Sequence, residues 1–153
     1  MTFRTLPLAE GSSASGEPRN LASAAVGATV IEVSSSYANS ASWAGANAID
    51  GNALTEWSSH GDGDDAFITI QLAEPTDIGR LGIWTRTMGA TAQITRFQVV
   101  TESGVILGPF DVPDAGGPHI YAVAARAQTL RFEVVASSGG NTGLVELVVY
   151  AAD

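Results

Sequence analysis

Four short segments of the chain alternate apolar with polar residues at a period of two. This spacing places the apolar side chains on one face of an extended strand and the polar ones on the other, which is typical of half-buried β-strands. The four segments are 67–72, with Ile68, Ile70 and Leu72; 81–86, with Leu81 and Ile83; 96–99, with Phe97 and Val99; and 130–135, with Leu130, Phe132 and Val134.

Turn-forming clusters separate these segments. They are rich in glycine, proline, aspartate and asparagine, and they lie at 61–65, 74–77, 108–109, 113–118 and 137–141. Turn clusters at such regular intervals predict an all-β sandwich of the jelly-roll type, in a single domain with about seven to nine strands.

Two segments depart from the strand pattern. Residues 122–128 are alanine-rich and helix-like, but they run into a strand pattern without a cap, so we expect a turn there. The stretch 8–19 is small and polar with no hydrophobic periodicity. We therefore expect residues 1–19 to form a flexible lead-in and residues 20–153 to form the folded domain.

Composition narrows the classes of function. The 153 residues contain no cysteine, no lysine, seven arginines and 16 acidic residues, for a net charge of −9. Disulfides, cysteine zinc sites, lysine Schiff bases and P-loop phosphate binding are therefore excluded. An acidic surface repels phosphate backbones and anionic headgroups, so nucleic acid and anionic membranes are unsuitable partners, whereas cations and neutral polar ligands remain.

No targeting or membrane-spanning segment is recognisable in the sequence. The first 20 residues contain no apolar core of a signal peptide, and no run of 18 uncharged apolar residues occurs. The expected location is cytoplasmic if the chain is complete.

A single carboxylate interrupts the most apolar segment of the chain. Glu146 lies in 144–150, which is otherwise apolar on both faces. Because unpaired burial of a carboxylate costs several kcal/mol, Glu146 needs a partner or an exposed edge position. An arginine ion pair would satisfy this requirement.

A second polar cluster surrounds the glycine turn at 47–57. Asp50, Asn52 and Thr55 are spaced so that side-chain and carbonyl oxygens converge, and such hard oxygen ligands suit calcium. Leu54 occupies the position where an EF-hand requires Asp or Asn. Spacing alone favours a simple turn stabilised by Asp50 over a metal site.

Three ordered motifs resemble a known family. They are Asn-Ala-Ile-Asp-Gly-Asn-x-x-Thr-x-Trp-Ser at 47–58, Gly-Asp-Gly-Asp-Asp-Ala-Phe-Ile-Thr-Ile-Gln-Leu at 61–72 and Gly-Leu-Val-Glu-Leu-Val-Val-Tyr at 143–150. Together they look like the discoidin-like domain of coagulation factors five and eight, a galactose-binding-like fold that includes carbohydrate-binding modules of family 32. The match covers about residues 20–150.

The resemblance implies a structural calcium ion that ties the first loop to the last strand. Asp50 and Glu146 would supply carboxylates and Thr55 its hydroxyl and carbonyl, with backbone carbonyls from Asn47, Asn52 and Val145. The ion would cancel the charge of −2 that Asp50 and Glu146 carry, which agrees with the reasoning from the residues.

The resemblance also implies a lectin-like site for glycans, often of galactose type, in loops at one end of the sandwich. Sugar recognition needs an aromatic face and groups that bind hydroxyls. Six residues meet this need: Trp43, His60, Asp62, Asp64, Arg86 and Asn141. Trp57 matches a core position of the family and is not included, and Trp43 has the alternative role of covering the metal loop.

The sequence carries no recognisable catalytic motif. It has no Gly-x-Ser-x-Gly elbow, no His-Glu-x-x-His, no cysteine nucleophile and no clear pair of facing carboxylates. We therefore expect a non-catalytic module, attached to a host enzyme or surface protein and extracellular or at the cell surface by resemblance. The alternative is a protein–protein or cell-surface adhesion module that binds no sugar.

Overall fold

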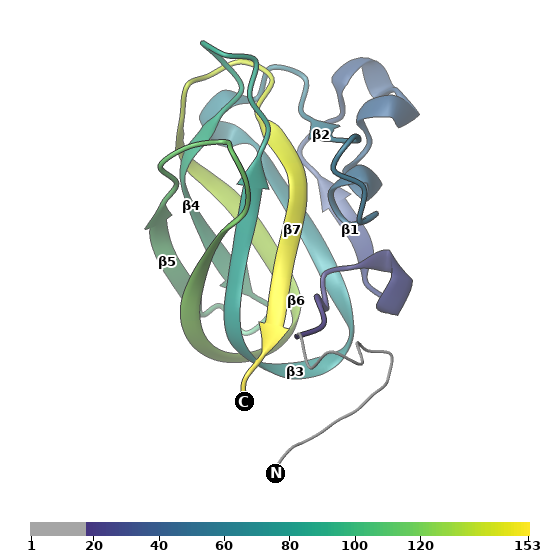
Figure 1. The fold of residues 1–153 in the computed structure, drawn as a ribbon, viewed down its shortest axis with the longest axis vertical. Coiled ribbons are helices and arrows are strands. Elements are labelled where there is room, and N and C mark those ends of the chain that lie inside the picture. Colours follow the sequence, from purple (N-terminus) through teal and green to yellow (C-terminus); the bar gives the residue numbers. More distant parts are fainter. Residues whose placement is uncertain (1–17) are drawn as a thin grey trace.

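The computed structural model describes residues 18–153; of the predicted lead-in at 1–19, only Pro18 and Arg19 fall within this range. The described part of the chain folds into antiparallel strands joined by short 3-10 turns (Figure 1). The strands are β1 (Thr29–Val33), β2 (Trp57–Ser58), β3 (Phe67–Thr85), β4 (Ile94–Thr101), β5 (Ile106–Asp111), β6 (His119–Ser137) and β7 (Gly143–Ala151). The 3-10 helices are η1 (Ala24–Val26), η2 (Tyr37–Asn39), η3 (Ala41–Trp43), η4 (Gly45–Ala48) and η5 (Gly63–Asp65).

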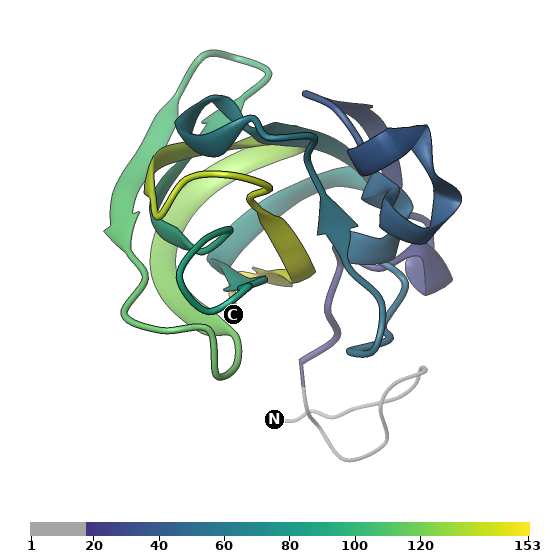
Figure 2. The same ribbon diagram turned by 90° about the horizontal axis from the view of Figure 1, so that it is seen from above.

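Two long strands build both layers of the sandwich. The first half of β3 pairs with β1 and with the second half of β6, whereas the second half of β3 pairs with β7 and with the first half of β6. The strand order is β2-β7-β3-β6-β4-β5, with β1 added on β3. Seen from above, the curved strands enclose the interior (Figure 2). The predicted single-domain β-sandwich is confirmed.

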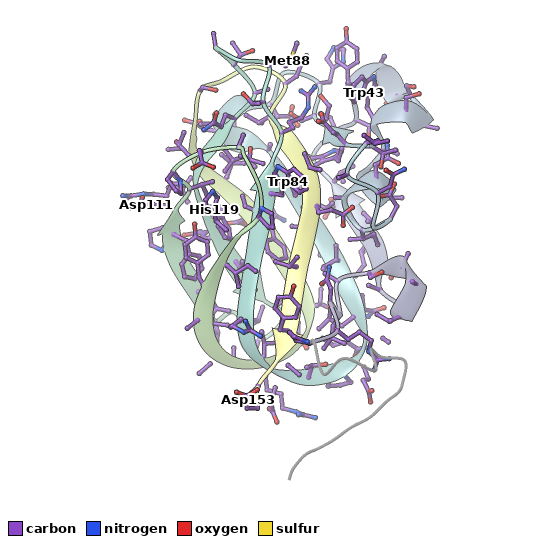
Figure 3. The ribbon with its side chains drawn as sticks, viewed as in Figure 1. Trp43, Trp84, Met88, Asp111, His119 and Asp153 are labelled. Carbon is purple, nitrogen blue, oxygen red and sulfur yellow. The ribbon has the colours of Figure 1, made fainter. Side chains whose placement is uncertain are left out.

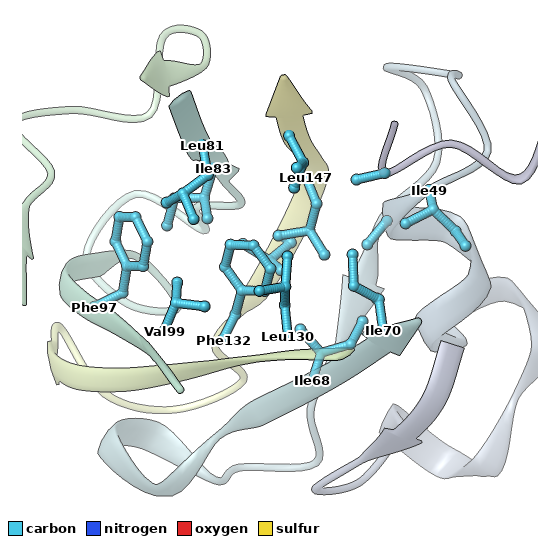
Figure 4. Packing of buried hydrophobic residues seen from close by; sticks show 14 of the residues in the cluster. Ile49, Ile68, Ile70, Leu81, Ile83, Phe97, Val99, Leu130, Phe132 and Leu147 are labelled. Atoms are coloured by element: carbon cyan, nitrogen blue, oxygen red, sulfur yellow. The ribbon is translucent and has the colours of Figure 1, made fainter. Parts of the chain in front are cut away.

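The core lies between the two layers and is built from the residues that the period-two pattern selects (Figure 4). Ile68 and Ile70 of β3 and Leu130 of β6 are at most 1% exposed, and Leu81 and Phe97 are equally buried. Each such side chain contributes roughly 1.5–3 kcal/mol of hydrophobic stabilisation. The four predicted strands are confirmed, and Trp57, at 1% exposure, is a core residue as expected.

Three predicted turns are strand instead. Residues 74–77 lie inside β3, where the register with β6 shifts between Gln71 and Thr76 and the strand passes from one layer to the other. Residues 122–128 lie inside β6, paired with Ile78 and Arg80 of β3. A backbone ladder with β3 outweighs the weak helix preference of alanine, which local composition alone cannot reveal.

The third of these corrections concerns the edge of the sheet. Gly108 and Pro109 lie within β5, not between strands, and are joined by a cis peptide bond. β5 is the last strand in the order, and a proline without an N–H is tolerated on an edge strand.

The loops at one end of the sandwich carry the side chains of interest. Trp43 and Met88 lie at this end, and Asp153 lies at the opposite end (Figure 3). The loop end is built from η2, η3, the segment after β2, the residues that follow β3 and the β6–β7 connection. Within residues 18–153, no helix has the length and apolar character to cross a membrane.

Candidate functional site

A buried arginine organises the loop end. Arg86 follows β3 and is 6% exposed. Its Nε donates to the Glu56 carboxylate at 2.8 Å, and its Nη1 donates to the Asn141 carbonyl at 2.6 Å and to the Ser58 hydroxyl at 3.3 Å. The guanidinium is therefore held in one orientation, and Glu56 balances its charge.

A glycine makes this arrangement possible. Gly143, at the start of β7, pairs with Ser58 of β2. A β-carbon at Gly143 would overlap the Trp57 carbonyl oxygen and would lie 3.0 Å from the Arg86 Cδ. Only a residue without a side chain lets β2, β7 and the arginine approach so closely.

Three aromatic rings contact one another at the loop end, and one of them, Trp43, also contacts the guanidinium. The Trp43 ring centre lies 5.3 Å from the Arg86 Cζ, within the range of a cation–π contact. Tyr37 meets Trp43 edge-on at 6.4 Å and stacks on His60 at 5.3 Å with an interplanar angle of 22°. These rings come from η2, η3 and the segment after β2, so the fold gathers them from separate loops.

A backbone hydrogen bond fixes the ring of His60. Its Nδ1 accepts a hydrogen bond from the Ala38 backbone N–H at 3.2 Å, so the proton of the neutral ring resides on Nε2. Ala38 and Asn39 both adopt left-handed backbone conformations, with φ of 55° and 53°. For residues with a side chain this conformation costs roughly 1–2 kcal/mol, and such strain clusters at functional sites.

The arginine and two of the rings line a hollow of about 190 Å³. Its walls consist of Tyr37, Trp43, Ser58, Arg86, Met88 and Asn141. The hollow thus combines apolar ring surface with fixed hydrogen-bond donors. This combination suits a ligand that has an apolar face and several hydroxyl groups.

The structure brings together some of the predicted ligand residues and separates others. Trp43, Arg86 and Asn141 line the hollow, and His60 stacks on its wall residue Tyr37. Asp62 and Asp64 do not line the hollow. Asp62 accepts a hydrogen bond from the Ser35 hydroxyl at 2.7 Å, and Asp64 accepts one from the Ser137 hydroxyl at 2.6 Å, so both carboxylates hold neighbouring loops in place.

Sequence reasoning missed three wall residues of the hollow and the residue that balances the arginine. The missed wall residues are Tyr37, Ser58 and Met88, and the missed counter-ion is Glu56. Tyr37 lies in the polar segment 34–42, where a lone exposed aromatic is a detectable signal. The sequence carries no such signal for Met88 or for the pairing of Glu56 with Arg86.

The 50–55 loop forms a compact turn next to the last strand. The Asp50 carboxylate accepts hydrogen bonds from the Asn52 backbone N–H, at 2.9 Å, and from the Thr55 hydroxyl. Gly51, at a φ of 73°, provides the left-handed position of the turn. Although partial burial raises the pKa of Asp50, the hydrogen bonds from Thr55 and Asn52, together with one to Glu146, outweigh it and hold the pKa below its ordinary value.

Glu146 faces this turn from β7. Its carboxylate accepts a hydrogen bond from the Gly51 backbone N–H at 3.1 Å and lies within hydrogen-bonding reach of Asp50. Burial, followed by the neighbouring Asp50, raises the pKa of Glu146 to about 8. The described residues offer Glu146 no arginine ion pair, so its partner is a second carboxylate 96 positions away.

Two facing carboxylates provide oxygen ligands that can bind a cation. Across residues 18–153, no group of three or more His, Cys, Asp or Glu side chains gathers in a way that could hold a metal. A cation between Asp50 and Glu146 would therefore draw its remaining ligands from hydroxyl and carbonyl oxygens, which calcium accepts readily. The Asn47 amide nitrogen is already used, since it donates to the carbonyls of Ala41, Ser42 and Glu56.

Comparison with known proteins agrees with this architecture. The family model for the F5/8 type C domain matches residues 30–104. No curated protein sequence matches the chain significantly. Solved structures resemble it closely in fold but at low sequence identity.

Three of these structures are modules that bind carbohydrate. The family 32 module of NanJ from Clostridium perfringens, in complex with galactose, is 20% identical with a TM-score of 0.68, over 80% of this chain and 93% of that one. A family 32 module from the same organism, in complex with GalNAc-β-1,3-galactose, is 17% identical with a TM-score of 0.69, over 81% and 95%. A chitosan-binding module from Paenibacillus sp. IK-5 is 22% identical with a TM-score of 0.62, over 87% and 99%.

The ordered motifs, the antiparallel sandwich and these matches lead to one conclusion. Residues 30–104 match the F5/8 type C (discoidin) domain, and the β-sandwich of the chain is structurally similar to carbohydrate-binding modules of family 32.

Proposed function

We propose that this domain is a non-catalytic sugar-binding module and that the hollow at its loop end receives one uncharged hexose ring of galactose type. The observation that carries this proposal is the buried Arg86 guanidinium, which is fixed by three hydrogen bonds beside the Trp43 ring. Its remaining N–H groups supply donors for adjacent hydroxyls, and the ring supplies a face for the C–H side of the sugar.

Charge favours a neutral sugar. Of the residues that the structure describes, Arg86 is the only basic one that lines the hollow, and Glu56 already balances its charge. With a net charge of −9 on the whole chain, a carboxylated or sulfated sugar would meet repulsion without a free cation to offset it. Structurally similar modules in complex with galactose and with GalNAc-β-1,3-galactose support the choice of a neutral, galactose-type ligand.

The binding site is shallow, so we expect weak affinity for each site. A single ring in a small open hollow buries little surface, and association entropy opposes it. Useful retention then requires several copies or attachment to a host enzyme or surface protein. This role fits an extracellular or cell-surface location.

The test is calorimetry with methyl β-galactoside, preceded by a glycan array that includes chitosan oligomers and charged glycans. Trp43→Ala removes the ring and should lower the affinity about fivefold or more, since aromatic contacts are worth about 1 kcal/mol or more. Ile106→Ala is the control, because Ile106 is 58% exposed on β5 and does not line the hollow. Absence of saturable binding to any glycan at millimolar concentration would overturn the proposal and favour an adhesion module.

We also propose that calcium binds between the 50–55 loop and β7 as a structural ion. Asp50 and Glu146 would hold it through their carboxylates, Thr55 through its hydroxyl and carbonyl, and Asn47, Asn52 and Val145 through their carbonyls. The ion would neutralise two carboxylates that otherwise repel one another. It would also close a loop of more than 90 residues, which stabilises the fold relative to the unfolded chain.

Calcium binding is tested by metal analysis and thermal unfolding. Purified protein should contain about one calcium ion per chain, and a chelator should lower the melting temperature. Protein that contains no calcium and melts at the same temperature with calcium or chelator would contradict this assignment.

A further inference from the structure

A second, larger hollow adjoins the first and shares Trp43 with it. Its volume is about 610 Å³, and its walls consist of Ala41, Ser42, Trp43, Asn47, Leu54, Thr55 and Glu56. Ligand clefts typically measure roughly 300–1,000 Å³, so the second hollow falls within this range, whereas the first, at about 190 Å³, is smaller. A ligand larger than one ring needs more room than the first hollow offers.

Hydrogen bonds hold the walls of the second hollow in place. One wall is η3 and the other is the segment 54–56. The Asn47 side-chain nitrogen links the two, because it donates to the carbonyls of Ala41 and Ser42 at 3.3 and 2.9 Å and to that of Glu56 at 3.0 Å. The hollow is therefore already formed before a ligand arrives, which lowers the entropic cost of binding.

The two hollows are adjacent, because they share one wall residue and a salt bridge links their walls. Trp43 lines both of them. Arg86 lines the first and is bonded at 2.8 Å to Glu56, which lines the second. A ligand that contacts the Trp43 ring in the first hollow therefore already touches a wall residue of the second hollow.

An exposed apolar side chain lines the second hollow. Leu54 is 93% exposed, and its backbone N–H is fixed to the Asn52 side-chain oxygen at 2.9 Å. A single exposed leucine is ordinary by itself, but this one shares a preformed hollow with a tryptophan and with the polar groups of Ser42 and Glu56. Apolar surface combined with hydroxyl-binding groups is what a second sugar ring requires.

We infer that the second hollow is a subsite for the next sugar unit of an oligosaccharide whose terminal ring occupies the first hollow. This inference rests on the proposed function and extends it, because it makes the ligand an oligosaccharide and not a single sugar. Leu54 and Trp43 contact the second ring, and Ser42 and Glu56 bind its hydroxyls. The second ring is uncharged, since the Glu56 carboxylate lines the second hollow and no basic side chain among the described residues does, so an anionic sugar would be repelled.

The experiment compares one sugar with two by calorimetry. The ligands are methyl β-galactoside, lactose and GalNAc-β-1,3-galactose. At least one of the disaccharides should bind about tenfold more tightly than methyl β-galactoside, which corresponds to the contacts of one additional ring. If neither disaccharide binds more tightly, the subsite does not exist.

Two matched variants separate the hollows. Leu54→Ala should reduce the disaccharide advantage to about threefold or less and leave the affinity for methyl β-galactoside unchanged. Met88→Ala, a change of similar size in the first hollow, should weaken all three ligands by the same factor. Equal weakening of all ligands by Leu54→Ala would overturn the inference.

Magnetic resonance of the leucine methyl groups tests the position of the second sugar ring without any substitution. In protein with labelled leucine methyl groups, the Leu54 signals should shift on addition of the tighter disaccharide and not on addition of methyl β-galactoside. Unchanged Leu54 signals with a bound disaccharide would place the second ring elsewhere and refute the subsite. If methyl β-galactoside and both disaccharides all fail to bind, the proposed function fails instead, so the two failures are distinguishable.

Discussion

Glu146→Gln is expected to act on stability in opposite directions with and without calcium. Glu146 is half-buried opposite Asp50, and burial, followed by that neighbour, raises its pKa from 4.5 to about 8. Because the pKa of Glu146 is higher in the folded than in the unfolded state, the protonated carboxyl stabilises the fold. This stabilisation is complete below pH 4.5 and is lost as the pH rises toward 8. The metal-free protein should therefore become less stable across this interval.

The size of the effect follows from the pKa interval. One pH unit corresponds to about 1.36 kcal/mol, so the interval between 4.5 and about 8 sets an upper bound of roughly 5 kcal/mol. Because Glu146 is partly open to solvent, screening reduces this to about 2 kcal/mol. Without calcium at pH 9, Glu146→Gln should thus be more stable than the wild type by about 2 kcal/mol. At pH 4, where Glu146 is protonated, the free energies of unfolding of the variant and the wild type should be nearly equal.

Calcium reverses the order. The wild type keeps both carboxylates and gains RT ln(1 + [L]/Kd), which is about 2.7 kcal/mol at one hundred times the dissociation constant. The variant lacks one charged ligand and should gain much less. At pH 9 with calcium at or above one hundred times the dissociation constant, the wild type should therefore be more stable than the variant.

Urea unfolding followed by tryptophan fluorescence, to which the buried Trp57 contributes, measures all of these differences. The free energy of unfolding is compared between wild type and variant, at pH 4 and pH 9, in metal-depleted buffer and in calcium. A variant that is no more stable than the wild type in metal-depleted buffer at pH 9 would refute the reasoning about the carboxylate pair. Equal stabilisation of both proteins by calcium would show that the ion binds elsewhere.

Three other substitutions test the ligand site and the core. Glu56→Gln uncovers the charge of Arg86 and should improve the affinity for methyl galacturonide relative to methyl galactoside about tenfold; an unchanged ratio in calorimetry would contradict the role of Glu56 in selecting neutral sugars. Gly143→Ala forces the overlap with the Trp57 carbonyl and should lower the free energy of unfolding by about 3 kcal/mol or more, so that wild-type stability of this variant would disprove the close approach. Ile70→Ala removes a fully buried side chain and should destabilise the fold by about 2–5 kcal/mol in urea unfolding, whereas a loss below about 1 kcal/mol would mean that the core can collapse around the gap.

The strands were predictable because their signal is local. Ile68, Ile70 and Leu72 alternate with polar residues, and this alternation alone determines which face of an extended strand is buried. The prediction was wrong for residues 122–128, because their seven positions include four alanines and the residues that make them a strand lie on β3, about 45 positions earlier in the chain. Pairing with a distant strand leaves no trace in local composition.

The facing of Asp50 and Glu146 was predictable only through the resemblance to a known family. Each residue is detectable by itself, since a carboxylate in an apolar strand and a carboxylate beside a glycine turn both require an explanation. That the two face each other follows from the register of β7 and the position of the turn, which the sequence does not encode locally.

By itself, the sequence determined the fold class, the buried face of each main strand, the acidic character of the chain and the absence of cysteine and lysine chemistry. These properties depend on residue type and on spacing over a few positions. Only the tertiary structure decided that Glu56 balances Arg86, that Tyr37, Ser58 and Met88 complete the first hollow, and that a second hollow adjoins it. The physical reason is that a binding surface is made where loops from distant parts of the chain meet, and their meeting depends on strand register and packing across the whole sandwich.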